Sequence, residues 1–282
     1  MNKPPPAGRE VAGWRLLRLI GQGAHGSVYL AEGHGHAVPV ALKLVSLDGS
    51  GGLRRARQAF LGSAQIAQRL QHPGIVALHA SGVEGSTGWL AMEAVPGTDL
   101  GPYTQAPRLL TEALVLLLAQ RLAQALDCAH RQGIVHRDLK PANVLVHWPS
   151  DTIKLVDFGL ARAADAAQTG TGIVLGTPAY MAPEQLAGNV PTPQSDLYAL
   201  GVMMFHLLAG RLPHEASNMG ELLRQVAKVP APELRLLVPG VSAQTSALVV
   251  RLLAKRPAAR PADAAEVDAA LRAITSRAPD AG

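Results

Sequence analysis

Two short segments carry the residue types that could do chemistry in this chain. The first is HRDLKPAN at residues 136–143, and the second is DFG at residues 157–159. From Asp138 to Asn143 the first segment offers a carboxylate, a lysine and an amide, and Asp157 adds a second carboxylate after a short apolar run. These groups could serve as a base, a cation for phosphate and two oxygen ligands for a hard metal ion. Phosphoryl transfer from a nucleotide–Mg²⁺ complex needs that set, because its catalysis is mostly positioning and charge stabilisation.

In this order and spacing the two segments resemble those of protein kinases, and the chain is most similar to bacterial members of the Ser/Thr type. The resemblance implies a role for each residue. Asp138 would accept the proton of the substrate hydroxyl, and Lys140 would neutralise the γ-phosphate. Asn143 and Asp157 would hold Mg²⁺ or Mn²⁺. A lysine two residues after the base is typical of Ser/Thr kinases, whereas tyrosine kinases usually differ there.

A third segment, GTPAYMAPE at residues 176–184, is similar to the substrate-docking loop of Ser/Thr kinases. By resemblance, Thr177 would bridge the base and the lysine of the catalytic loop. Glu184 would pair with Arg260, which lies in a matching KRPAARP segment. Asp196, at the start of a long apolar stretch, would anchor the catalytic loop.

A glycine-rich segment, GQGAHGSV at residues 21–28, lies between two predicted strands. Glycine lets the backbone approach phosphate oxygens and offers N–H donors. The pattern alone also fits a hairpin turn or a dinucleotide-binding fold, but the strand expected after it argues against the second. VALK at residues 40–43 follows on the next strand, where the family places the lysine that pairs with the α- and β-phosphates. A lone lysine on a strand is usually a surface residue. The apolar neighbours of Lys43 and its distance from the glycines favour phosphate binding instead.

The resemblance also implies further residues around ATP. They are drawn from the glycine-rich segment and from the strands expected near it and after the catalytic loop: Ile20, Gly21, Gly23, Gly26, Val28, Ala41, Met92, Glu93, Val95 and Leu145. Val28 and Ala41 would cover the adenine with Leu145 beneath it, and the methionine would stand at the back of the pocket. The backbone of Glu93 and Val95 would bond to the adenine edge. The apolar members of this set are equally compatible with ordinary core positions.

One position in the expected small-lobe helix departs from the family pattern. The family places a glutamate there to hold the phosphate lysine, and bacterial relatives read F-x-x-E-A. Here FLGSA at residues 60–64 puts Ser63 in that place. No Asp or Glu occurs anywhere in residues 49–83, so the neighbouring turns of this helix cannot supply the carboxylate. We therefore expect Lys43 to pair with Asp157, with the phosphates alone or with an acid from a partner.

The stretch between the DFG segment and the docking loop is small, Ala-rich and polar. Thr169 and Thr171 stand where bacterial kinases commonly autophosphorylate. Arg137, next to the base, could pair with such a phosphate. The alternative is that this stretch is merely a flexible loop.

Composition and charge argue against several other classes. The 282 residues suffice for two lobes, and the net charge of +5 comes without a Lys/Arg block or a basic–aromatic alternation, which disfavours nucleic-acid binding. The single Cys128 excludes an internal disulfide, disfavours a zinc site and fits a reducing compartment, so we expect a cytoplasmic protein. The N-terminal residues lack the apolar region of a secretory signal. The apolar runs at 113–119 and 197–209 are too short or interrupted, so we expect no membrane span.

The elements that must position these residues follow from the hydrophobic pattern. Residues 1–13 are typical of a flexible arm. Short β-like runs flank one helix up to residue 94, and the pattern becomes helical from Thr111, a plausible N-cap. We predict strands at 14–20, 27–31, 38–44, 75–80, 89–94, 144–146 and 153–156, and helices at 53–70, 111–132, 195–209, 217–229, 243–253 and 262–274.

The predicted fold is therefore α+β and bilobal, as the resemblance to kinases implies. A small five-stranded β lobe with one helix would occupy residues 14–94. A larger α-helical lobe with the catalytic and activation loops would occupy residues 95–274, and residues 275–282 would form a tail.

The predicted function is ATP- and Mg²⁺-dependent transfer of the γ-phosphate to Ser/Thr hydroxyls of proteins, with autophosphorylation in the activation loop. Self-association would allow that autophosphorylation to occur in trans. The alternative, which Ser63 favours, is a nucleotide-binding pseudokinase that acts as a scaffold or regulator. A kinase of small molecules is a third option, which the protein-type docking loop at residues 176–184 disfavours.

Overall fold

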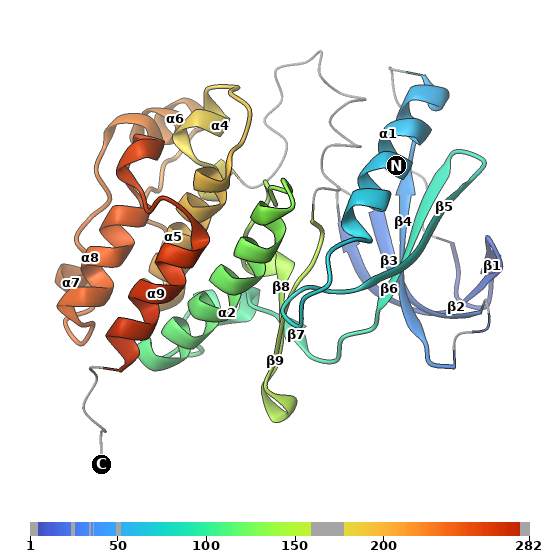
Figure 1. Cartoon of the computed structure of the whole chain (residues 1–282), viewed down its shortest axis with the longest axis horizontal. Coiled ribbons are helices and arrows are strands. Elements are labelled where there is room, and N and C mark those ends of the chain that lie inside the picture. Colours follow the sequence, from blue (N-terminus) through green and yellow to red (C-terminus); the bar gives the residue numbers. More distant parts are fainter. Residues whose placement is uncertain are drawn as a thin grey trace. The chain divides into compact units, whose positions relative to one another are not determined.

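The computed structural model describes residues 5–23, 26–33, 35, 37–48, 52–158 and 178–276. The chain divides into two compact units (Figure 1). The first unit comprises residues 1–96 and 158–173, and the second comprises residues 97–157 and 174–282. In the described residues the first unit is mainly β-sheet and the second is mainly helical (Figure 1).

The first unit is built on an antiparallel sheet with the strand order β1-β2-β3-β4-β6-β5 (Figure 1). Its strands are β1 (Glu10–Val11), β2 (Trp14–Gly23), β3 (Gly26–Gly33), β4 (Val40–Ser46), β5 (Leu78–Glu84) and β6 (Thr87–Glu93). The five longer strands overlap the five that the hydrophobic pattern predicts. The described sheet therefore has six strands rather than the five predicted.

The additional strand β1 lies in the segment that we expected to be a flexible arm. Val11 pairs with Trp14 at the start of β2 and is buried. Further along the arm, the Tyr29 hydroxyl donates a hydrogen bond to the carbonyl of Pro5 at 2.8 Å. A strand of two residues is too short to show the alternation on which the prediction depends, and tertiary contacts rather than local pattern hold it.

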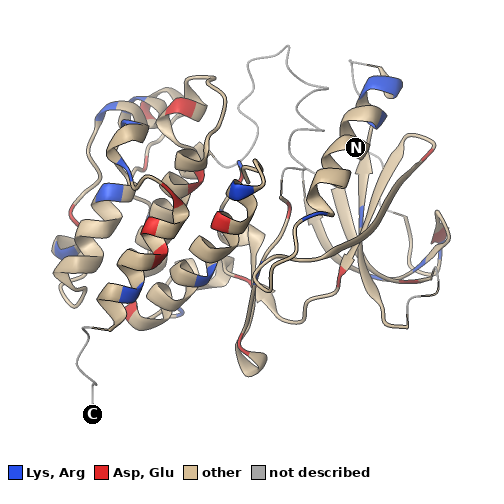
Figure 2. Ribbon diagram, in the orientation of Figure 1, with Lys and Arg blue, Asp and Glu red and all other residues tan. Residues whose placement is uncertain are grey.

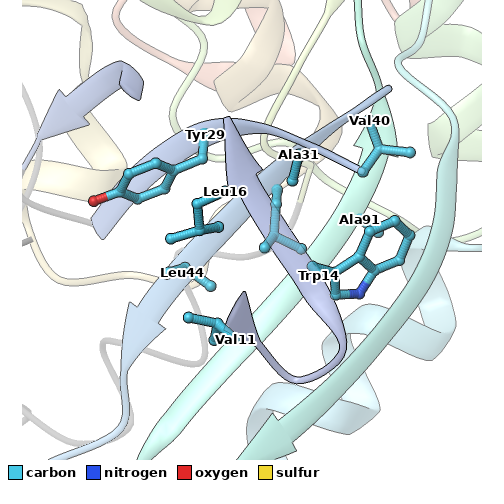
Figure 3. Close-up of a cluster of buried hydrophobic side chains, with 9 residues drawn as sticks. Val11, Trp14, Leu16, Tyr29, Ala31, Val40, Leu44 and Ala91 are labelled. Carbon is cyan, nitrogen blue, oxygen red and sulfur yellow. The ribbon is translucent and has the colours of Figure 1, made fainter. Parts of the chain in front are cut away.

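Alternation along β4 sends successive side chains to opposite faces of the sheet. Val40 and Leu44 join a buried cluster with Trp14 and Tyr29 on one face (Figure 3). Ala41 belongs to the cluster on the opposite face. Lys43, two residues further along β4, shares that second face by the same alternation.

Helix α1 (Leu53–Ala67) packs on the face of the sheet that carries Ala41. Its buried residues Ala56, Phe60 and Ala64 recur every fourth position, the spacing that aligns side chains along one helix face. The helix ends three residues before the predicted Leu70. Leu70 is nevertheless buried, so the hydrophobic pattern extends past the end of the helix.

The second unit packs its helices around the long apolar helix α5. The helices are α2 (Glu112–Arg131), α4 (Pro183–Leu186), α5 (Pro193–Ala209), α6 (Met219–Lys228), α7 (Leu234–Leu237), α8 (Ala243–Leu252) and α9 (Ala264–Thr275). A small antiparallel sheet joins β7 (Thr98–Asp99), β8 (Val144–His147) and β9 (Thr152–Leu155). The five longer helices were predicted, whereas α4 and α7 are single turns that the pattern did not indicate. In the described part of the chain, no helix has the length and apolar character needed to cross a membrane.

The predicted limits of α2 are confirmed by its capping. The Thr111 side chain accepts a hydrogen bond from the backbone N–H of Leu114 at 3.5 Å, as an N-cap does. Gly133 follows the C-cap Gln132 and has a φ of +73°, the left-handed conformation that favours glycine after a helix. Helix α2 therefore ends at a fixed point, shortly before the catalytic segment at residue 136.

Candidate active site

The second unit brings together the three polar residues predicted in the catalytic segment. Lys140 Nζ donates a hydrogen bond to Asp138 Oδ2 at 2.7 Å, and Asn143 Nδ2 donates to the same oxygen at 3.1 Å. Asn143 Nδ2 also donates to the backbone carbonyl of Asp138 at 2.7 Å. The Asp138 carboxylate is thus held next to a cation, with most of its surface withdrawn from water.

A buried carboxylate on α5 fixes the loop that carries Asp138. Asp196 Oδ2 accepts a hydrogen bond from the backbone N–H of His136 at 2.8 Å, and Oδ1 accepts one from Arg137 at 2.9 Å. His130 Nε2 lies 2.8 Å from the same carboxylate. The predicted anchoring of the catalytic loop by Asp196 is confirmed, and it explains how Arg137 keeps a φ of +74°.

His136 ties the catalytic loop to the segment that leads to Asp157. Its Nε2 is 2.9 Å from the carbonyl of Val156, which can only accept, so Nε2 carries the proton. Its Nδ1 then accepts a hydrogen bond from the backbone N–H of Asp138 at 3.3 Å. The ring is fully buried. The sequence indicates no role for this histidine, because its contact with Val156 spans 20 positions of the chain.

Asn143 and Asp157 have the chemistry expected of ligands for a hard cation. Asn143 uses its side-chain N–H₂ within the loop, so its Oδ1 is the atom that it can offer to a metal ion. Its backbone carbonyl accepts a hydrogen bond from Val156 at 3.0 Å, next to Asp157. Asp157 itself has a φ of +65°, a conformation that Asp tolerates better than most residues. One amide oxygen and one carboxylate therefore come from two linked segments and fit Mg²⁺ or Mn²⁺.

The predicted ion pair of the docking loop forms. Arg260 Nη1 and Nη2 donate to Glu184 Oε1 and Oε2 at 2.7 and 2.8 Å, and Ser195 Oγ donates to Oε1 at 2.7 Å. The guanidinium also lies over the Tyr198 ring, 5.0 Å from its centre. Burial raises the pKa of Glu184, but the hydrogen bonds from Arg260 and Ser195 outweigh burial and leave that pKa below its ordinary value. Thr177, Thr169 and Thr171 lie outside the described residues.

The first unit contributes the residues expected to bind the nucleotide. Lys43 on β4 is only 5% exposed and pairs in register with Val28 on β3 and Leu90 on β6. Gly26 has a φ of +125°, and a Cβ atom there would lie 2.0 Å from the carbonyl oxygen of Leu44. Only glycine fits at that position. The hairpin of β2 and β3 thus needs a glycine at Gly26, and the buried Lys43 lies on β4, the strand that pairs with β3.

The other residues implied for ATP binding divide between the units. Ile20, Gly21 and Gly23 lie on β2, Val28 on β3, Ala41 on β4, Met92 and Glu93 on β6, Val95 just after β6, and Leu145 on β8 of the second unit. Ala41 and Met92 are direct partners in the sheet and both are buried. The backbone N–H of Glu93 donates to Ala77 at 2.9 Å, so the group that Glu93 could offer to adenine is its carbonyl oxygen.

Helix α1 carries no carboxylate along its whole length. Ser63 is half-buried on it, next to the buried Ala64 that packs on the sheet. The departure seen in the sequence therefore falls on the helix that covers the same face of the sheet as Lys43.

The comparisons with known proteins agree with this arrangement. The family model for the protein kinase domain matches residues 14–271. This chain belongs to the protein kinase family. The predicted resemblance and the predicted protein-kinase-like fold are both confirmed. The chain is 40% identical over 268 residues to the serine/threonine-protein kinase PknJ of Mycobacterium tuberculosis, covering 92% of this chain and 45% of PknJ. It is 36% identical over 273 residues to the serine/threonine-protein kinase Pkn1 of Myxococcus xanthus, covering 95% of this chain and 39% of Pkn1.

Solved kinase structures share the fold. The kinase domain of Mycobacterium tuberculosis PknI is 31% identical, with a TM-score of 0.77, and the match covers 96% of this chain and 99% of that one. Rad53 residues 1–466 in complex with AMP-PNP is 26% identical, with a TM-score of 0.76, covering 92% of this chain and 64% of Rad53. This kinase chain spans less than half the length of the PknJ and Pkn1 relatives that it matches.

Proposed function

We propose that this kinase chain transfers the γ-phosphate of ATP to Ser or Thr hydroxyls of proteins, with Mg²⁺ or Mn²⁺ as cofactor. The observation that carries the proposal is the Asp138 carboxylate held by Lys140 and Asn143 in a loop that buried Asp196 fixes. Relatives named as serine/threonine-protein kinases support the choice of acceptor. Rad53 in complex with AMP-PNP supports the choice of nucleotide.

The residues of the second unit divide the work of the transfer. Asp138 accepts the hydroxyl proton as the hydroxyl oxygen bonds to the γ-phosphorus. The bond between that phosphorus and the bridging oxygen of ATP breaks, and ADP leaves. Lys140, 2.7 Å from Asp138, brings a positive charge to the phosphoryl oxygens. Asn143 Oδ1 and the Asp157 carboxylate would hold Mg²⁺ or Mn²⁺, and the bound cation would supply positive charge to the phosphates of ATP.

The residues of the first unit bind the nucleotide. Lys43 pairs with the α- and β-phosphates, and the glycine-rich hairpin, including Gly21, Gly23 and Gly26, offers backbone N–H groups to the phosphates. Val28, Ala41 and Met92 of this unit contact the adenine, and the backbone of Glu93 and Val95 bonds to its edge. The family resemblance implies a further adenine contact for Leu145, which lies on β8 of the second unit. Ile20 flanks the same hairpin.

A direct assay tests this function. The purified chain is incubated with γ-labelled ATP, Mg²⁺ or Mn²⁺ and a generic basic protein, and with peptides that differ only in a Ser, Thr or Tyr acceptor. We expect label on the Ser and Thr peptides, little on the Tyr peptide, and none above background with Asp138→Asn. Equal labelling by wild type and Asp138→Asn would contradict the assignment of the base.

The single Cys128 favours a reducing, cytoplasmic compartment.

Thr169 and Thr171 are the proposed autophosphorylation sites. Autophosphorylation in trans would require transient self-association. Mass spectrometry after ATP treatment should find phosphate at one or both threonines. Phosphate found only elsewhere, with full activity in the Thr169→Ala/Thr171→Ala double variant, would refute control by this loop.

Ser63 favours one second candidate, a pseudokinase that binds nucleotide and acts as a scaffold or regulator. The observation behind it is that α1 offers no carboxylate to the phosphate lysine. ATP binding without Asp138-dependent transfer would support this candidate over the enzyme.

A further inference from the structure

Gln185 joins two segments of the second unit that the proposed chemistry needs together. Its Oε1 accepts a hydrogen bond from the backbone N–H of Ala182 at 3.0 Å, and its Nε2 donates one to the carbonyl of Arg137 at 3.0 Å. One end of a single side-chain amide is therefore used in the docking loop and the other in the catalytic loop. The neighbouring Glu184 is held by Arg260, so the short helix α4 that carries Gln185 is fixed from another direction as well.

The carbonyl that Gln185 binds belongs to the peptide unit immediately before the base. Arg137 has a φ of +74°, which residues other than glycine adopt only when their surroundings enforce it. Its N–H is held by Asp196 at 2.9 Å, and its carbonyl is held by Gln185. The N–H of the same peptide unit, that of Asp138, donates to His136 Nδ1 at 3.3 Å. Both polar ends of the Arg137–Asp138 peptide are therefore fixed, one of them by a residue of the docking segment.

We propose that Gln185 is a positioning residue, which orients Asp138 through the Arg137–Asp138 peptide and couples the docking loop to the catalytic base. Lys140 and Asn143 hold the carboxylate end of Asp138, and Gln185 holds its backbone end. The inference rests on the proposed phosphotransfer function. Glutamine suits the role because its amide both accepts and donates, whereas an ionised glutamate has no donor for the Arg137 carbonyl.

The test uses variants that separate the two hydrogen bonds. Gln185→Glu keeps an acceptor for the Ala182 N–H but turns an acceptor towards the Arg137 carbonyl. Gln185→Met fills similar volume with neither bond. Gln194→Glu is the matched control, because Gln194 Nε2 also donates to a backbone carbonyl, that of Ala262, at 2.8 Å on the surface of the same unit.

Steady-state kinetics with ATP and a Ser peptide give the readout. We expect Gln185→Glu and Gln185→Met to lower kcat about tenfold, the effect of one lost hydrogen bond at the base, with KM for ATP changed less than about twofold. Gln194→Glu should stay within about twofold of wild type in both constants. Thermal midpoints of all three variants are measured as well, so that a fall in kcat is assigned only to variants that are folded at the assay temperature.

Several results would overturn the inference. An unchanged kcat in Gln185→Met would do so, and so would a fall in kcat that Gln194→Glu reproduces. If Gln185→Glu does not fold, Gln185→Met decides, since it places no charge against the carbonyl. A wild-type chain without Asp138-dependent transfer would overturn the proposed function and this inference with it. An active wild type with unaffected Gln185 variants would overturn this inference alone.

Discussion

The catalytic loop and helix α1 differ in their charged residues. In the loop and the elements around it, carboxylates form hydrogen bonds with partners from the same unit. Asp138 pairs with Lys140, Glu184 pairs with Arg260, and Asp196 accepts hydrogen bonds from two backbone N–H groups. Helix α1 carries arginines in its first turns and no acid at all, which Figure 2 shows as blue without red. The second unit therefore sets the geometry of its own base, whereas α1 cannot supply the ion pair that the family uses to orient the phosphate lysine.

The largest effect should come from the metal ligand of the second unit. Asp157→Ala should abolish turnover with Mg²⁺ or Mn²⁺, a loss of about 10³-fold or more, because charge on the β- and γ-phosphates would remain unneutralised. Initial rates of transfer to a Ser peptide measure it. Phosphorylation at the wild-type rate by Asp157→Ala would rule out Asp157 as a ligand of the metal ion.

The Glu184–Arg260 pair tests whether the second unit needs its internal charge pairing. Arg260 is 3% exposed, so Arg260→Met would leave the Glu184 carboxylate buried without its cation. Breaking a buried pair by removing one partner costs about 3–5 kcal/mol, and we expect the free energy of unfolding to fall by that order. Denaturant unfolding measures the change. Arg251→Met is the control, since Arg251 pairs with Glu266 on the surface and should cost less than about 1 kcal/mol. An equal loss of unfolding free energy in the two variants would contradict the claim that the buried ion pair contributes more than the surface pair.

Lys43 tests the first unit. Lys43→Met keeps the length of a side chain that is 5% exposed but removes its positive charge. We expect kcat/KM for ATP to fall by about 10²-fold, the usual cost of removing one charge-stabilising donor, while folding is retained. Near-normal kinetics would mean that the phosphates are neutralised without this lysine, and the first unit would then contribute less than we propose.

A carboxylate restored to α1 tests whether the missing ion pair limits turnover. Ser63→Glu restores a carboxylate to α1 and should raise turnover by several-fold at most, because an ion pair that water still reaches contributes only about 1 kcal/mol. Ser63→Gln is the matched control of similar size without charge and should not show the gain. The contrary result would be a crystal structure that shows a carboxylate of this chain other than Asp157 bound to Lys43. Together with an inactive Ser63→Glu variant, that result would mean that a different acid has taken over the role of the missing glutamate.

Most of the chemistry was predictable from the sequence because it depends on short, ordered segments. The residues of HRDLKPAN lie within one loop, so the contacts of Asp138 with Lys140 and Asn143 follow from their local spacing. The Glu184–Arg260 pair spans 76 positions and was predicted only through the family resemblance. The long helices α2 and α5, which carry long runs of apolar residues, were predicted within about two residues of their observed ends.

What the sequence did not indicate depends on tertiary contacts. Strand β1 and the single turns α4 and α7 are too short to carry a periodic signal. The left-handed conformation of Arg137 occurs in a residue type that rarely adopts it, and hydrogen bonds with Asp196 and Gln185, both distant in the sequence, hold it. The bridging role of Gln185 follows from a contact across 48 positions, and no local pattern marks it.

Nucleotide binding and phosphate transfer, determined on the same purified samples of wild type and Asp138→Asn, decide whether this chain is an active kinase. We expect both proteins to bind ATP in the presence of Mg²⁺ with affinities within about threefold, because Asp138 acts on the hydroxyl rather than on the nucleotide. We expect the wild type to place phosphate on Ser or Thr, and Asp138→Asn to be slower by about 10²-fold or more. If both bind ATP equally and neither transfers phosphate under Mg²⁺ or Mn²⁺, the chain is a pseudokinase and the account is wrong.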